Sequence, residues 1–148
     1  MLKLSRLTDY AVAAMVRLGA AGGAETSPGI AASIGVPEPT VAKVLKSLAG
    51  RGLISSRRGV NGGYRLDRPL HDISVVDVIV AIDGPIALVS CIEVGGSGCE
   101  NQLCPLAGRW DPVNRAIYEA LSGITLADMA ASTALPVHGI VAKFDEVV

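Results

Sequence analysis

The sequence predicts a mainly helical fold with one small β-hairpin and further helices after it. Three observations lead to this prediction. Apolar residues recur at helical spacing in several segments, and most of these segments end at a glycine. One pair of short apolar runs is joined by a link rich in Gly and Asn, as a β-hairpin requires. The 148 residues, half of them hydrophobic, suggest one domain, or a small domain with an appendage, with enough apolar content for a core.

Three helices are expected in the N-terminal fifty residues. The first covers about residues 8–21, with Thr8 as its cap. The second is capped by Ser27 and stops at Gly35. The third lies within "PEPTVAKVLKSLAGRG" and has an apolar stripe made of Val41, Val44, Leu45 and Leu48. The short turn "GVPE" joins the second and third helices, so together they predict a helix-turn-helix.

A β-hairpin follows this helix-turn-helix directly, which is the position of a wing. Its strands are expected at Leu53-Ile54 and at Tyr64-Arg65-Leu66. Another helix should begin near Ser74 and stop at Gly84. Later in the chain, "DPVNRAIYEALSG" predicts a helix capped by Asp111, and "TLADMA" predicts a short helix capped by Thr125. The fold class is therefore a winged helix-turn-helix with additional helices.

The two halves of the chain carry opposite charge. Residues 1–70 contain ten Lys and Arg against four Asp and Glu, whereas residues 71–148 contain three against ten. A basic half of this kind is typical of contact with a polyanion. Polar residues on the third helix recur every three positions opposite its apolar stripe, and the wing adds arginines and glycines that admit a phosphate. An ordinary solvated basic face is the alternative to a double-stranded DNA interface, which would consist of Thr40, Lys43, Lys46, Arg57, Arg58, Asn61, Gly62, Gly63 and Tyr64.

All three cysteines lie within fourteen residues, in the Gly-rich stretch "CIEVGGSGCENQLCP". Soft thiolates select zinc, copper(I) or iron–sulfur clusters. Cys91, Cys99 and Cys104 lack the paired C-x2-C spacing that is typical of zinc sites, and their wider spacing suits a larger site with several metal atoms. A proline after the last cysteine also ends some ferredoxin cysteine runs. Two alternatives stay open: three small core hydrophobes, or a metal-free thiol redox sensor in which two cysteines pair on oxidation.

Several classes of protein are disfavoured by the sequence. No stretch approaches the ~18 apolar residues needed to span a bilayer, so we expect a cytoplasmic protein without a membrane partner. Thiols stay reduced there, and clustered cysteines bind metal more often than they form disulfides. His71 and His138 are the two histidines, and neither lies in a recognisable catalytic signature. We therefore predict that the protein is not an enzyme and has no small-molecule substrate.

Three stretches together resemble one bacterial family of regulators: "LTDYAV", "RRGVNGGYRL", and three cysteines before a "W…V…I" helix. This family contains the iron–sulfur assembly regulator IscR, the nitric-oxide sensor NsrR and the iron regulator RirA. The similarity covers about residues 1–130. It implies a homodimer formed through a long C-terminal helix, here at about residues 106–122. The expected organisation is a winged helix-turn-helix DNA-binding domain (1–84), a cluster-binding loop (85–105), the dimerisation helix with the short helix (106–130) and a tail (131–148).

The resemblance also implies a transcription regulator, a repressor of cluster-assembly or iron genes, controlled by a [2Fe–2S] or [4Fe–4S] cluster on the three cysteines. IscR-like members have a histidine three residues after the last cysteine, where this chain has Ala107. The NsrR-like branch has a carboxylate near the start of the first helix, donated by the other subunit, and Asp9 occupies the matching place. Asp9 is either this ligand or an early-helix acid favoured by the helix dipole. The other candidates for the fourth ligand are Glu93, Glu100, His71 and His138.

Overall fold

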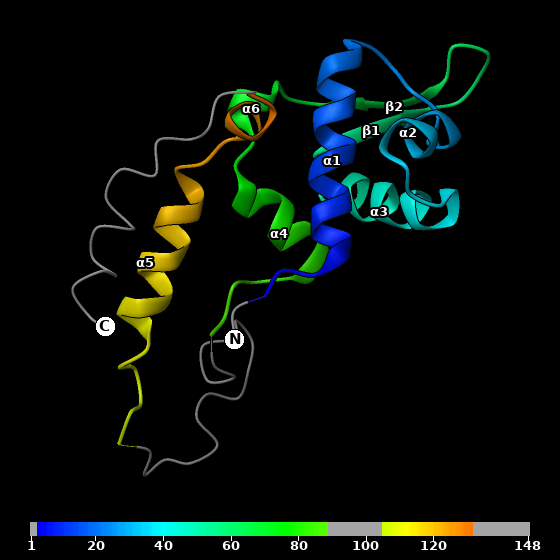
Figure 1. Cartoon of the computed structure of the whole chain (residues 1–148). Coiled ribbons are helices and arrows are strands. Elements are labelled where there is room, and N and C mark those ends of the chain that lie inside the picture. Colours follow the sequence, from blue (N-terminus) through cyan, green and yellow to red (C-terminus); the bar gives the residue numbers. More distant parts are fainter. Residues whose placement is uncertain (1–2, 89–104, 132–148) are drawn as a thin grey trace.

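The computed structural model describes residues 3–88 and 105–131. These residues form six α-helices, a short 3-10 helix (η1) and one two-stranded sheet, in the order α1-α2-α3-β1-β2-η1-α4-α5-α6 (Figure 1). The mainly helical class with one hairpin is confirmed. The part of the sequence outside the described residues contains Cys91, Cys99, Cys104, Glu93, Glu100, His138 and the tail from residue 132.

The first helix, α1 (Arg6–Ala21), begins two residues earlier than the sequence predicts. Ser5 is its cap, not Thr8, because the Ser5 side chain accepts a hydrogen bond from the Thr8 backbone N–H at 3.2 Å. Thr8 lies inside the first turn and is only 1% exposed. Its hydroxyl donates to the Asp83 carboxylate at 2.7 Å. The predicted cap therefore ties α1 to a residue 75 positions further along the chain.

The helix-turn-helix consists of α2 (Ser27–Ile34) and α3 (Glu38–Gly50). Thr26 caps α2, so the cap is one residue earlier than predicted, and α2 ends as expected at Gly35, whose φ is 68°. The predicted apolar stripe of α3 is confirmed. It faces the core and consists of Val41, Val44, Leu45 and Leu48.

The predicted wing is confirmed as strands β1 (Ile54–Arg57) and β2 (Gly63–Leu66), which pair antiparallel. Ile54 pairs with Leu66 and Arg57 pairs with Gly63. Because side chains alternate along a strand, Ile54, Tyr64 and Leu66 pack on the core, while Arg57 and Arg65 are exposed on the other side. The tip of this hairpin extends beyond the helices around it (Figure 1).

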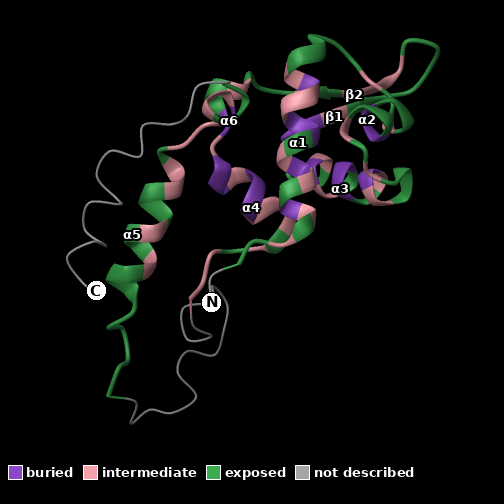
Figure 2. Cartoon of the chain, in the orientation of Figure 1, coloured by how far each residue is buried: buried purple, intermediate pink, exposed green. Residues whose placement is uncertain are grey.

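The core joins the N-terminal helices to two later elements. After η1 (Leu70–Asp72), Ser74 caps α4 (Val75–Asp83) in a reciprocal capping box, and α4 stops at Gly84 as predicted. Thr125 caps α6 (Leu126–Ala130) in the same way. Leu126 is wholly buried in the core that α1, α3 and α4 share, and Ser74 and Thr125 form an isolated β-bridge. Figure 2 shows the buried residues gathered where α1, α3 and α4 face each other.

The helix α5 (Asp111–Ser122) differs from the rest, because none of its residues is buried. It packs against α4 and stands apart from the wing (Figure 1). Trp110, not Asp111, is its cap residue, and it provides no side-chain cap. The long helix expected over about residues 106–122 is not confirmed: residues 105–110 form turns, since Gly108 has a φ of 72°. Within the described ranges, no helix is both long and apolar enough to span a membrane.

Candidate nucleic-acid interface

The predicted recognition residues share one face of α3. Lys43 and Lys46 are exposed and Thr40 is half-buried in the first turn of the helix, while the opposite face is packed in the core. Neither lysine forms a salt bridge with another described residue. The two ammonium groups are therefore available to a polyanion, on a helix whose position the core determines.

The wing tip adds further cations. Arg57, Arg58 and Asn61 are exposed, and the two arginines form no salt bridge within the described ranges. Between them and Asn61 lies Val60, whose relative exposure is 105%. An apolar side chain thus protrudes from the wing tip among the arginines. The sequence interpretation did not include Val60, and its only signal is an apolar residue at the tip of a hairpin.

Gly62 and Gly63 shape the wing instead of contributing side chains to it. The Gly62 N–H donates to the Gly59 carbonyl at 2.9 Å, and a Cβ at Gly62 would collide with the Arg57 carbonyl oxygen. Gly63 has a φ of 140°, and a Cβ there would lie 2.5 Å from the Glu25 carbonyl oxygen. Both predicted site residues are thus required for the conformation of the tip.

Tyr64 anchors the base of the wing to the α1–α2 connection. Its N–H donates to the Glu25 carbonyl at 2.7 Å, and the Glu25 N–H donates to the Tyr64 carbonyl at 2.9 Å. The Glu25 carboxylate in turn accepts from the Arg17 guanidinium, with an Nε–Oε2 distance of 3.0 Å. The hydrogen bond and the charge of Glu25 raise the pKa of Arg17. Helix α1, the connection and the wing are therefore joined in one chain of contacts.

A second set of contacts lies at the other end of α1. The Asp83 carboxylate accepts from the Thr8 hydroxyl and, at 3.3 Å, from the Ser5 N–H. Partial desolvation raises the pKa of Asp83, but the hydrogen bonds from Ser5 and Thr8 outweigh it, so this pKa lies below its ordinary value. Asp83 is the last residue of α4, and the cysteine-containing segment follows soon after it. The structure thus brings the start of α1 to the end of α4, eight residues before Cys91 in the sequence.

Asp9 is exposed in the first turn of α1, next to Thr8. His71 is exposed in η1 beside Asp72, with 3.5 Å between Nε2 and Oδ1. In the described part of the chain, no three His, Cys, Asp or Glu residues are grouped so as to hold a metal ion. The metal assignments of Asp9, Cys91, Cys99 and Cys104 stay predictions.

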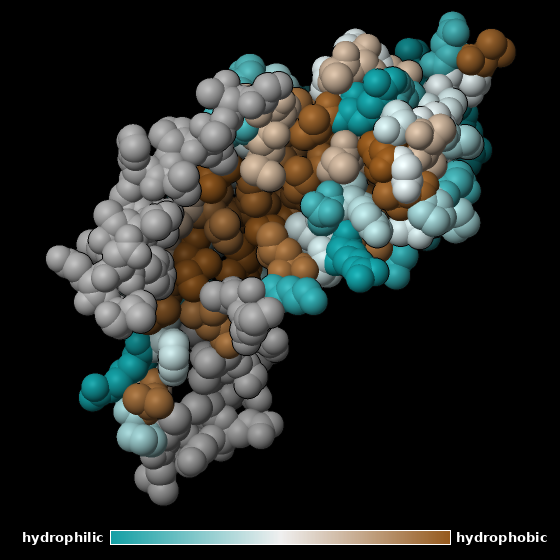
Figure 3. All heavy atoms as spheres, viewed as in Figure 1, coloured by the Kyte–Doolittle hydropathy of each residue, from teal (hydrophilic) through white to brown (hydrophobic). Residues whose placement is uncertain are grey.

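The surface is divided between two kinds of residue. In Figure 3, hydrophilic side chains gather at the end that carries the wing, α2 and α3. A broad apolar area lies between α1 and α5, over α4. Four large apolar residues in and before α5 are exposed: Leu106, Trp110, Val113 and Tyr118.

Known proteins are similar to this chain in both sequence and fold. A helix-turn-helix transcriptional regulator of Mycobacterium tuberculosis (strain H37Rv) is 36% identical over 139 residues, which is 93% of this chain and 86% of that protein. NsrR of Geobacillus kaustophilus is 29% identical over 131 residues, 86% of this chain and 89% of NsrR. CymR, named the global cysteine regulator of B. subtilis, superposes with a TM-score of 0.69 at 29% identity, over 90% of this chain and all of CymR. For IscR of T. potens the TM-score is 0.64 at 31% identity, over 90% and 93% of the chains.

These relatives are transcription regulators, which confirms the predicted family resemblance and the prediction that the protein is not an enzyme. The profile of the Rrf2 family, described as iron-dependent transcriptional regulators, matches residues 4–132. The match therefore includes the winged helix-turn-helix, the cysteine-containing segment, α5 and α6. The chain belongs to the Rrf2 family of transcriptional regulators.

Proposed function

We propose that this regulator is a repressor whose affinity for its operator is set by an iron–sulfur cluster on Cys91, Cys99 and Cys104, with cluster-assembly or iron genes as its targets. The observation that carries the proposal is the contact between Asp83 and the first turn of α1. Through this contact, the end of α4, eight residues before the first of the three thiols, is tied to the helix that supports both α3 and the wing. A transcription regulator of this kind acts in the bacterial cytoplasm.

The proposed DNA contacts divide into two groups. Helix α3 would enter the major groove, where Thr40 reaches base edges and Lys43 and Lys46 reach phosphates. The wing would meet the adjacent minor groove, where Arg57, Arg58 and Asn61 reach its floor or the phosphates that border it. Each phosphate that is neutralised releases counterions, so we expect the affinity to fall steeply as the salt concentration rises.

The donor set of the chain suits an iron–sulfur cluster. Three thiolates are soft ligands that select iron–sulfur clusters over hard cations, and the family is described as iron-dependent. The place of the IscR-like histidine is taken by Ala107, whereas Asp9 is exposed in the first turn of α1. We propose the three cysteines and Asp9 as the ligands, with Asp9 donated by the partner subunit. The bound cluster would supply a redox-sensitive, labile group between the two subunits.

A switch requires that the cluster bind the DNA-competent and DNA-incompetent conformations with different affinities. The described contacts offer a connection between the two sites. It leads from Asp83 to Thr8 at the start of α1, and from Arg17 near its end through Glu25 to Tyr64 in the wing. A change in the segment after α4 would thus be felt at the base of the wing.

We also propose a homodimer in which a second copy of the chain covers the exposed apolar residues of α5. Trp110 is 40% exposed and Tyr118 is 48% exposed. Large aromatic side chains of this kind are enriched in the centres of protein interfaces. The dimer would also bring two DNA-binding ends together on one operator, as is usual for helix-turn-helix regulators.

Regulation by thiol oxidation without a metal is the second candidate. It is supported by the three cysteines, two of which could pair on oxidation. Colour separates the two candidates. Protein that is purified without oxygen and reconstituted with iron and sulfide should absorb visible light and give a cluster EPR signal after reduction. Each Cys→Ser variant should lose most of this absorbance, while its circular dichroism stays helical.

A colourless parent protein would exclude the cluster and favour the thiol mechanism.

The role of Asp9 has its own test. We expect Asp9→Ala to retain a cluster, because a carboxylate oxygen is a weaker iron ligand than the three thiolates that remain. The loss of this ligand should shift the spectrum of the cluster and increase its sensitivity to oxygen. In mixed dimers of an Asp9→Ala subunit with a triple Cys→Ser subunit, the intact thiols face only the intact Asp9 of the partner. Those dimers should therefore show the parental spectrum, and an Asp9→Ala spectrum would place the ligand in the same subunit.

A further inference from the structure

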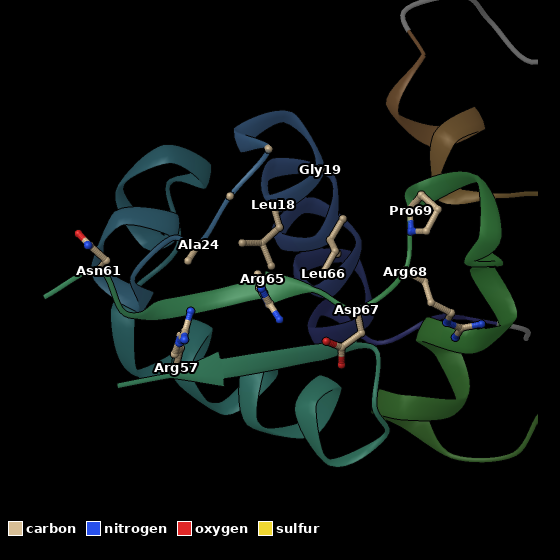
Figure 4. Close-up of a pocket in the computed structure, with 12 residues that line it drawn as sticks. Leu18, Gly19, Ala24, Arg57, Asn61, Arg65, Leu66, Asp67, Arg68 and Pro69 are labelled. Atoms are coloured by element: carbon tan, nitrogen blue, oxygen red, sulfur yellow. The ribbon is translucent and has the colours of Figure 1, made fainter. Parts of the chain in front are cut away.

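A groove of about 490 Å³ lies along the outer face of the wing hairpin. One wall is formed by the last turn of α1 and the glycines that follow it, and the other is formed by β2 and the residues after it (Figure 4). Arg57 and Asn61 lie at the wing end of the groove, and Arg65 lies near its middle. The groove therefore continues from the proposed wing contacts towards the base of the hairpin.

The strand register sets the positions of two guanidinium groups. Arg57 pairs with Gly63, and Ser55 pairs with Arg65. Arg57 and Arg65 are thus diagonal neighbours on the same face of the hairpin, with backbone positions about 7–8 Å apart. Both side chains are exposed, and Figure 4 shows them on the same side of the sheet. One anion placed over the outer face of the two strands is within reach of both arginines.

The charges around the groove favour an anion. Asp67 is the one acidic residue among those that line it, against three arginines. Arg68 is already engaged, since its Nη1 donates to the Asp72 carbonyl at 3.4 Å and its guanidinium turns towards α4 (Figure 4). Arg57 and Arg65 form no salt bridge with another described residue. A Cβ at Gly22 or Gly23 would meet nothing within 4 Å, so the glycine wall leaves room for a bulky ligand.

We infer that Arg57 and Arg65 together clamp a backbone phosphate of the DNA strand that flanks the wing. This inference rests on the proposed wing–DNA contact and adds Arg65 to it. Guanidinium groups bind phosphate through two parallel hydrogen bonds, which makes the pair a positioning contact without sequence preference. A free small anion fits less well, because small-ligand sites enclose about 70–90% of their ligand and this groove is open.

The contact is tested by measuring DNA affinity against salt concentration for the parent and for Arg65→Ala. Arg65 is exposed on a strand, so we expect the variant to stay folded, which circular dichroism checks. Its affinity for operator and for unrelated DNA should fall by the same factor, about tenfold. The log–log salt slope should become smaller by about 0.9, the value for one phosphate. Arg65→Lys should restore the slope, and Arg115→Ala, which removes an exposed arginine on the distant α5, should keep the parental slope.

Three results would overturn the inference. The first is an unchanged salt slope in Arg65→Ala. The second is an affinity loss confined to the operator, which would mean that Arg65 reads bases. The third is that the parent binds inorganic phosphate at millimolar concentration and Arg65→Ala loses this binding but keeps its DNA affinity. That result would mean that the groove binds a small anion. If Arg58→Ala weakens DNA binding and Arg65→Ala does not, the proposed function stands and only this inference fails.

Discussion

The wing and α5 are two projecting parts of the same chain, and they differ in both surface and anchoring. The wing exposes cations and is held to the core by paired backbone hydrogen bonds between Glu25 and Tyr64. Helix α5 has no buried residue and exposes Tyr118, and its cap residue Trp110 is exposed as well. Its hydrogen bonds to the chain after α4 come from the Asn114 side chain, which donates to the Ile86 carbonyl at 2.9 Å and accepts from the Leu88 N–H at 3.2 Å. The difference indicates two kinds of partner: a rigid charged surface suits a polyanion, whereas an apolar helix suits another protein surface.

The largest expected effect comes from breaking the wing at its backbone. Gly63→Ala places a side chain at a φ of 140° and against the Glu25 carbonyl oxygen, so the hairpin must shift. We expect DNA affinity to fall by about 100-fold or more, because returning the shifted hairpin to its DNA-binding geometry would cost about 3 kcal/mol. Gel-shift titration measures this loss. Gly123→Ala is the matched control, because Gly123 has a φ of −75° at the end of α5 and a Cβ there would make only ordinary contacts, and it should bind like the parent.

The next effect concerns the charge of the wing tip. Arg58→Ala removes an exposed guanidinium that would lie in the minor groove, and we expect binding about tenfold or more weaker. Thr40→Ala should cost less and relax the sequence preference, as a selection from random DNA would show. The affinities should be compared at ~150 mM salt, where exposed charges are screened beyond about 8 Å. If Arg58→Ala then binds DNA as tightly as the parent, the wing is not part of the interface.

The third prediction concerns the proposed dimer surface at α5, where an introduced negative charge should separate the subunits without unfolding them. Trp110→Glu introduces a carboxylate into the exposed apolar surface, where it would be buried without a partner in the dimer. We expect sedimentation to report a monomer with parental helical content. Arg115→Ala on the same helix tests for a nonspecific effect and should stay dimeric. An unchanged dimer of Trp110→Glu would show that the interface lies elsewhere.

The smallest effect is expected at the contact between α1 and α4. Thr8→Val keeps the volume of a buried side chain and removes its hydrogen bond to Asp83. We expect the free energy of unfolding to drop by only about 1 kcal/mol at neutral pH, because water can replace the lost hydrogen bond to the exposed Asp83 carboxylate. Thr8→Ser keeps the hydroxyl and is the control.

The same contact predicts a pH dependence. The folded-state pKa of Asp83 is lowered, so its stabilising contribution is complete above the ordinary aspartate pKa of about 3.9. This contribution is lost as the pH falls through the lowered folded-state pKa. The stability difference between the parent and Asp83→Asn should therefore be constant from about pH 5 to 7 and shrink in more acidic solution. A difference that grows on acidification would contradict the assignment.

Local patterns predicted those parts of the fold that depend on neighbours in the sequence. The stripe on α3, the wing and the capping box at Thr125 each follow from residues a few positions apart. The role of Thr8 did not, because its partner Asp83 lies 75 residues away. Gly63 was predicted as a contact residue, but its need for glycine comes from the Glu25 carbonyl, which only the folded chain brings close. Arg65 was read as a strand residue, and the strand register gives it a place beside Arg57.

The central claim is that the state of the cysteine segment controls DNA binding. Its most direct test follows operator affinity and visible absorbance in one anaerobic sample while a chelator removes the iron, using DNA that the protein has selected from a random pool. The account predicts that affinity changes in step with absorbance. It also predicts that the triple Cys91→Ser, Cys99→Ser and Cys104→Ser variant keeps the affinity of the iron-free parent throughout. An affinity that stays constant while the absorbance disappears would contradict it.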